Sequence, residues 1–179
     1  MSNNQILGFY TLDGIECDVD NASYVKLELL GRGKNTENNY FLVSLSKLEY
    51  VLKHSWYLDS NGYPMTYTSR SKTLHRNLFG KQEQGYVIDH INRNKLDNRM
   101  ENLRVITSRE NSYNRTKNAN SNNNYKGVIK KKNSYVACIS KNGVRREISG
   151  FETEEEAAKM YDMMAEELFG EFAGKNFDT

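Results

Sequence analysis

Residues 85–111 read GYVIDHINRNKLDNRMENLRVITSREN, and the fold is predicted first from the pattern of this stretch. Its first six residues, 85–90, form a short apolar run that predicts a strand with a carboxylate and an imidazole at its end. A polar loop over residues 92–102 follows, and residues 103–106 predict a second strand. The stretch therefore predicts two strands joined by a polar loop, with titratable groups where the first strand ends.

The carboxylate and the imidazole at that strand end belong to Asp89 and His90. A neutral histidine can take a proton from water near pH 7, and a divalent cation can neutralise charge on a phosphate and its leaving oxygen. A helix is predicted to start at Thr107 or Ser108, which are favoured N-cap residues. Its first turn would carry Asn111, whose amide oxygen can join Asp89 as a metal ligand.

The segment from Asp89 to Asn111 resembles the HNH nucleases, and most of all those of phage homing endonucleases. The upstream Leu74-His-Arg76 and Trp56-Tyr-Leu resemble the leader of that group. The resemblance implies a ββα-metal fold in which His90 is the general base and Asp89 and Asn111 hold one ion.

The resemblance also assigns Asn102, as the middle residue of the motif, to holding the loop and orienting the imidazole. Family members have either His or Asn at this position. The ion is expected to be Mg²⁺ or Mn²⁺, and no structural zinc is expected because two cysteines cannot form a four-thiolate site.

Two further histidines have less specific interpretations. His54 is interpreted as a surface residue at the end of a short helix. His75 has two open interpretations, a packing or hydrogen-bonding role and a contact with phosphate.

The part before residue 85 predicts small elements with alternating or helical spacing. Strands are predicted over 24–29 and 40–43, short helices over 46–53 and 73–79, and a hairpin over 56–58 and 63–68.

Charge is distributed unevenly along the 179 residues. Residues 70–132 contain 15 Lys and Arg against 5 Asp and Glu, whereas residues 151–179 contain 2 against 9. A basic block is typical of a protein that binds the phosphate backbone, although a solvated surface gives the same count. The chain has no long apolar run and no secretory leader, so we expect a cytoplasmic location and no membrane contact.

The C-terminal part predicts three strands, over 125–130, 135–140 and 145–148, and one helix. Asn142-Gly143 is a strong hairpin signal, and Thr153-Glu-Glu-Glu156 is a capping box. By alternation, Tyr135, Ala137 and Ile139 are expected to face the helix. The opposite face would then carry Ser134, Val136, Cys138 and Ser140.

This part resembles the plant ethylene-response-factor DNA-binding domain of the APETALA-two type. The likeness rests on Tyr125-Lys-Gly-Val128, Ala137-x-Ile139, Gly150-Phe-Glu-Thr-Glu-Glu-Glu-Ala-Ala158, Tyr161-Asp162 and Asn176-Phe177. It implies a three-stranded antiparallel sheet packed on one helix, with the open face of the sheet in the major groove. The chain departs from the plant pattern at four expected contact positions, which are Ile129, Cys138, Ser140 and Glu147.

Together these observations predict an α+β protein with an HNH nuclease domain over 1–115, an Asn-rich linker over 116–124 and a DNA-binding domain over 125–179. The predicted function is a site-selective endonuclease of double-stranded DNA, of the phage homing or intron-associated kind, without a small-molecule cofactor. The sequence leaves the oligomeric state open and favours a monomer. A DNA-binding regulator with a silent nuclease site, and an RNA-binding or structural module, are the alternatives. The candidate DNA contacts are Arg76, Arg109, Lys126, Lys130, Lys131, Lys132, Arg145 and Arg146.

Overall fold

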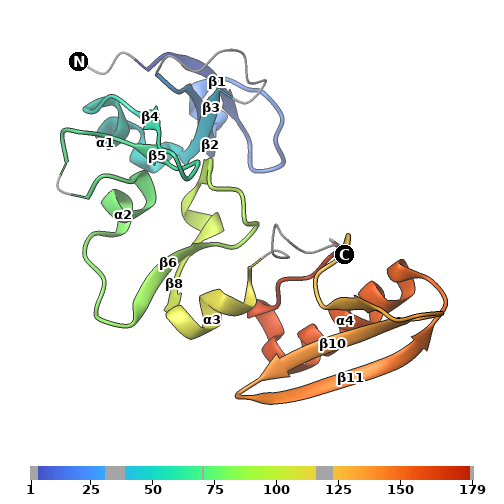
Figure 1. Cartoon of the computed structure of the whole chain (residues 1–179). Helices are drawn as coiled ribbons and strands as arrows, with labels where there is room; N and C mark the ends of the chain where they lie inside the picture. Colours follow the sequence, from blue (N-terminus) through green and yellow to red (C-terminus); the bar gives the residue numbers. More distant parts are fainter. Residues whose placement is uncertain (1–3, 31–38, 70, 116–122, 178–179) are drawn as a thin grey trace. The chain divides into compact units, whose positions relative to one another are not determined.

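A computed structural model describes residues 4–30, 39–69, 71–115 and 123–177 of the chain. It contains short helices and small sheets, which agrees with the predicted α+β class. The chain divides into two compact units, Met1–Ile106 and Thr107–Thr179, and each is described by itself (Figure 1). No helix within the described ranges is both long and apolar enough to cross a bilayer.

The first unit is built around a four-stranded sheet. Its strand order is β1 (Ile6–Tyr10), β2 (Tyr24–Glu28), β3 (Tyr40–Ser44) and β7 (Asp97–Asn98). The first three strands pair antiparallel, and β7 pairs parallel with β3. The sequence predicted β2 and β3 but neither edge strand. Two residues of β7 are too few to show an alternating pattern, so only their pairing with β3 makes them a strand.

Short elements connect and cover this sheet. The strands β4 (Tyr57–Leu58) and β5 (Pro64–Met65) form an antiparallel hairpin, as predicted. A separate two-stranded sheet consists of β6 (Tyr86–His90) and β8 (Leu103–Thr107). The remaining elements are η1 (Val19–Asn21), η2 (Leu45–Lys47), α1 (Leu48–Leu52), α2 (Leu74–Phe79) and η3 (Met100–Asn102).

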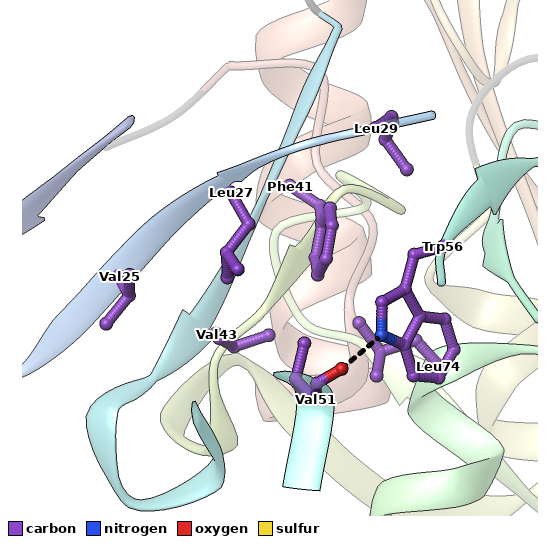
Figure 2. Close-up of a cluster of buried hydrophobic side chains, with 8 residues drawn as sticks. All are labelled: Val25, Leu27, Leu29, Phe41, Val43, Val51, Trp56 and Leu74. Carbon is purple, nitrogen blue, oxygen red and sulfur yellow. Dashed lines mark hydrogen bonds between the residues drawn. The ribbon is translucent and has the colours of Figure 1, made fainter. Parts of the chain in front are cut away.

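The core of the first unit lies on one face of the sheet (Figure 2). Alternate residues of β2 and β3 enter it because successive side chains of a strand point to opposite faces. Trp56 is fully buried among them, and its Nε1 donates to the carbonyl oxygen of Val51 at 2.9 Å. The cluster comprises Val25, Leu27, Leu29, Phe41, Val43, Val51, Trp56 and Leu74.

The second unit contains a three-stranded antiparallel sheet with the order β11 (Val144–Phe151), β10 (Tyr135–Lys141) and β9 (Val128–Lys130). Asn142 and Gly143 join β10 to β11 with positive φ angles of 53° and 81°. The helices are α3 (Ser108–Tyr113), α4 (Glu154–Phe169) and η4 (Gly170–Phe172). Both α3 and α4 begin with complete capping boxes, at Thr107 and Thr153.

One side of β10 packs against α4 through Ala137 and Ile139, as alternation predicted. Val136 was predicted to face outward toward DNA, but only 2% of it is exposed. It sits on the central strand between Ile129 and Ser149, so its neighbours in the sheet flank it on both sides. The prediction of Val136 as part of an open surface was therefore wrong.

Helix α3 belongs to the second unit because its last residue packs there. The ring of Tyr113 stacks on that of Phe169 with centroids 4.0 Å apart. The contacts thus divide the chain before α3, whereas the sequence placed the end of the nuclease domain at residue 115. Most of the predicted linker, residues 116–122, lies outside the described residues. The predicted domain boundaries stay a prediction.

Two glycines of the second unit provide a test of its packing. Gly127 and Gly143 both have positive φ, 70° and 81°, but a Cβ at Gly127 would lie 1.9 Å from the Tyr161 ring. The left-handed conformation costs an alanine roughly 1–2 kcal/mol, and overpacking adds about 1–3 kcal/mol more. We expect Gly127→Ala to destabilise the chain by about 3 kcal/mol or more in urea unfolding. Gly143→Ala is the matched control, because a Cβ there would meet open space. It should cost only the roughly 1–2 kcal/mol of the left-handed conformation. Equal losses in the two variants would contradict the packing described here.

Candidate active site

Asp89 and His90 are the last two residues of β6, and both are buried, with 8% and 5% of each residue exposed. As neighbours on a strand they point to opposite sides. Each has a partner from a different part of the first unit, and these partners define the site.

The His90 ring contacts Asn98 of β7. His90 Nε2 lies 3.3 Å from the amide oxygen of Asn98, while the amide nitrogen of Asn98 donates to the carbonyl oxygen of Lys95 at 3.0 Å. The second bond orients the amide, so its oxygen accepts from Nε2–H. This places the lone pair of the neutral imidazole on Nδ1. Asn98 was not among the predicted site residues, because a buried amide inside a polar loop has no distinguishing pattern in the sequence.

Asp89 forms an ion pair with Arg104 of β8. The Nε and Nη2 atoms of Arg104 both donate to the same carboxylate oxygen, Oδ2, at 3.1 and 3.0 Å. The two side chains are largely buried, with 9% of the Asp89 side chain and 14% of the Arg104 side chain exposed. A guanidinium that remains charged supplies the opposite charge that a buried carboxylate requires.

Asn102 holds the loop that follows His90. Its amide nitrogen donates to Asp97 O at 2.8 Å and to Asn92 Oδ1 at 2.9 Å, and its amide oxygen accepts from Asn92 N at 3.0 Å. These contacts agree with the predicted role in the loop. The His90 ring itself contacts the amide oxygen of Asn98, and Asn102 holds the loop that follows His90.

Two aromatic rings pack against His90. The ring of His75 on α2 meets it edge-on, with centroids 5.2 Å apart and planes 75° apart. The second ring is that of Tyr63, in the turn between β4 and β5. Its centroid lies 4.9 Å from that of His75 and 6.0 Å from that of His90. Lys95 Nζ in turn lies 4.7 Å from the centre of the Tyr63 ring. The predicted leader thus contributes directly to the surroundings of His90.

Burial keeps both histidines neutral. The pKa of His75 is lowered from 6.5 to about 3, mainly by burial and in addition by the neighbouring His90 and Arg76. Burial also lowers the pKa of His90, although the Asn98 hydrogen bond and the charges of Asp89 and Asp97 oppose the change. His75 makes no hydrogen bond in the described part of the chain, and its Nδ1 is wholly buried. An unsatisfied buried nitrogen of this kind costs about 1–3 kcal/mol.

The remaining candidate residues are distributed over both units. Arg76 on α2 is exposed in the first unit. In the second unit Asn111 and Arg109 lie on α3, half-buried and exposed respectively. Lys130, Lys131 and Lys132 are exposed at the end of β9 and in the turn after it.

Three other basic side chains of the second unit have partners within it. Arg145 donates to Glu147 at 2.7 Å, and Arg146 lies 3.5 Å from Glu167. Lys126 donates to two main-chain carbonyls, Tyr113 O at 2.7 Å and Gly174 O at 3.3 Å. Its ammonium therefore ties α3 to the C-terminal segment, a structural role that its sequence position did not reveal.

The donor atoms near the strand end are hard oxygens rather than thiolates. Among the described residues there is no group of three or more His, Cys, Asp and Glu side chains arranged to hold a metal. One carboxylate and one amide oxygen are what Mg²⁺ commonly takes from a protein while keeping several waters. The carboxylate of Asp89 and the amide oxygen of Asn111 are each of this donor type.

Comparison with known proteins identifies the family of the chain. A family model described as HNH endonuclease matches residues 75–113, a range that contains His75, Asp89, His90, Asn98 and Asn111. An uncharacterized HNH endonuclease of Acanthamoeba polyphaga mimivirus is 44% identical over 160 residues, which cover 86% of this chain and 82% of the viral protein. No solved structure matches the chain. The chain belongs to the HNH endonuclease family.

The low pKa of His75 generates a prediction about acid stability. When the chain unfolds, the pKa of His75 returns from about 3 to 6.5. Between these two pH values the unfolded state therefore binds a proton that the folded state does not bind. Stability is therefore complete above pH 6.5 and falls as the pH decreases toward 3. Between pH 7 and pH 5 we expect a loss of about 2 kcal/mol from this residue in urea unfolding. His90 contributes in the same direction. His75→Phe should reduce the difference between the two pH values, and an unchanged difference would contradict the assignment.

Proposed function

We propose that the chain is a site-selective endonuclease of double-stranded DNA, in which His90 is the general base and Asp89 and Asn111 hold one divalent metal ion. The observation that carries the proposal is the bond between His90 and Asn98, because it orients a buried neutral imidazole at the end of β6. The family membership supplies the class of reaction.

His90 would act through Nδ1. Asn98 occupies Nε2, so the basic lone pair of the neutral ring is on the other nitrogen. Burial keeps the pKa of His90 below its ordinary value, so the ring is unprotonated at neutral pH and can accept the proton of a water molecule. Tyr63 and His75 restrict the ring from its other sides.

Asp89 would bind the metal ion at the strand end. A divalent cation supplies charge for the phosphate and for the leaving 3′ oxygen. The second protein ligand, Asn111, is proposed from its place in the sequence motif and in the first turns of α3. Asn102 would serve this site by holding the loop over residues 92–97.

One observation favours a second function. Two hydrogen bonds from Arg104 end on the Asp89 carboxylate, and a cation would compete with them for its negative charge. If Arg104 stayed paired with Asp89, the chain would bind DNA without cutting it. This second function is that of a DNA-binding regulator. Whether the purified chain cleaves DNA in the presence of Mg²⁺ or Mn²⁺ decides between the two.

The second unit would supply much of the affinity for DNA. Its exposed run Lys130–Lys132 can neutralise phosphates, and exposed Arg109 can add to this. Arg145 and Arg146 would have to exchange Glu147 and Glu167 for phosphates. Lys126 would likewise have to leave the carbonyls of Tyr113 and Gly174 to contact a phosphate. A sheet reading the major groove, and a phage homing or intron-associated role, remain part of the proposal from sequence resemblance.

Replacing the general base tests the proposed chemistry. We expect His90→Ala to nick supercoiled plasmid about 10²- to 10⁴-fold more slowly with Mg²⁺, because the attacking water keeps its proton. Binding of the same DNA in EDTA should be unchanged. His54→Ala is the matched control, since His54 contacts Thr68 and lies in the same unit. If His90→Ala nicks as fast as the control, His90 is not the base.

Neutralising the lysine run tests the DNA-binding role. Each phosphate contact contributes about 0.9 to the slope of log affinity against log salt. The full chain with Lys130, Lys131 and Lys132 all changed to Gln should bind duplex DNA more weakly and with a shallower slope. Lys159→Gln is the control, because Lys159 on α4 is paired with Glu155 at 2.9 Å. An unchanged slope in the triple variant would remove this run from the interface.

A further inference from the structure

His75 is a polar residue in a place where packing alone would favour an apolar one. It is 6% exposed, its ring lies between those of Tyr63 and His90, and it makes no hydrogen bond in the described part of the chain. A phenylalanine would make the same ring contacts without burying an unsatisfied nitrogen. Stability in the unbound chain therefore does not explain an imidazole at this position.

The surroundings of His75 indicate what its missing partner is. The ring is neutral, so it offers one N–H donor and one acceptor, and it carries no charge to balance. Arg76 on the same helix is exposed, and Lys95 lies over the Tyr63 ring. The carboxylate of Asp59 also acts on His75, so the two cations outnumber the one nearby anion. A neutral donor in these surroundings suits a ligand that is anionic and has acceptor oxygens, which describes a phosphodiester.

We propose that His75 is a second substrate-contacting histidine, whose ring N–H donates a hydrogen bond to an oxygen of the DNA phosphodiester beside His90. This inference rests on the proposed function and deepens it. Both residues keep a small exposed fraction, 6% for His75 and 5% for His90, and their rings are in edge-on contact. Their centroids are 5.2 Å apart, a spacing that a phosphate and its attacking water can span.

The roles of the two histidines then differ. His90 is oriented by Asn98 and takes a proton, whereas His75 keeps its proton and shares it with the phosphate. His75 would contribute most where negative charge increases on the phosphate oxygens, which is the condition for a donor to accelerate the reaction. Because Nδ1 of His75 is wholly buried, the donor to the phosphate would be the N–H at Nε2.

The first test compares substitutions of His75 in plasmid nicking with Mg²⁺. His75→Phe keeps the ring contacts and removes the donor, and we expect its rate to fall about 10- to 100-fold, as for the loss of a hydrogen bond to a charged group. His75→Asn and His75→Gln offer an amide N–H in place of the two ring nitrogens, and one of them should recover part of the rate. His54→Phe is the matched control and should nick like the unaltered chain. His75→Phe at the unaltered rate would overturn the proposal.

The second test does not depend on cleavage or on a variant that folds. The chain has three histidines, so the ring nitrogen signals of His54, His75 and His90 can be followed separately by ¹⁵N NMR in EDTA. Adding a short DNA duplex should move the signals of His75 and leave those of His54 in place. If the duplex binds and the His75 signals do not move, the proposal fails even where the chain cuts DNA. If they move and the unaltered chain does not cut, the contact stands and the proposed catalytic function fails.

Discussion

The arrangement of the site depends on the pairing of a two-residue strand with the sheet of the leader. Asp97 and Asn98 of β7 lie opposite Leu42 and Val43 of β3, and Leu42 N also donates to Leu96 O at 2.8 Å. This pairing anchors the loop after His90 in the core sheet of the first unit. It also places Asn98 where its amide oxygen meets the imidazole.

The charge of Asp97 is accommodated at the same point. Only 2% of the residue is exposed, and its two carboxylate oxygens accept from Arg99 at 2.8 and 2.7 Å and from Asn92 at 2.8 Å. Loss of these partners would lower the free energy of unfolding by several kcal/mol, about 3–5 kcal/mol for one broken buried pair. Ser44 at the end of β3 adds a bond from Met100 N at 2.8 Å. The leader is therefore part of the site, because these bonds join its sheet to the loop that positions His90.

The charge of the second unit is less available for binding than its composition suggests. The basic block contains Lys126, whose ammonium is committed to two carbonyls, and β11 contains Arg145, which is paired with Glu147. Lys130–Lys132 lies in an exposed turn where lysines are readily solvated. The number of basic residues indicates the kind of binding partner. The pairing within the unit determines which basic side chains can contact that partner.

Much of this protein follows from short-range sequence information. The capping boxes at Thr107 and Thr153 and the turn at Asn142-Gly143 depend on neighbouring residues, so the sequence alone located the starts of α3 and α4 and the β10–β11 hairpin. The motif from Asp89 to Asn111 likewise identified the family. Asn98, the Arg104–Asp89 ion pair and the contact of His75 with His90 join segments that are 8 to 15 residues apart. Only the pairing of β7 with β3 and the burial of β6 bring such groups together, because the partner of a buried polar group is decided by packing in three dimensions.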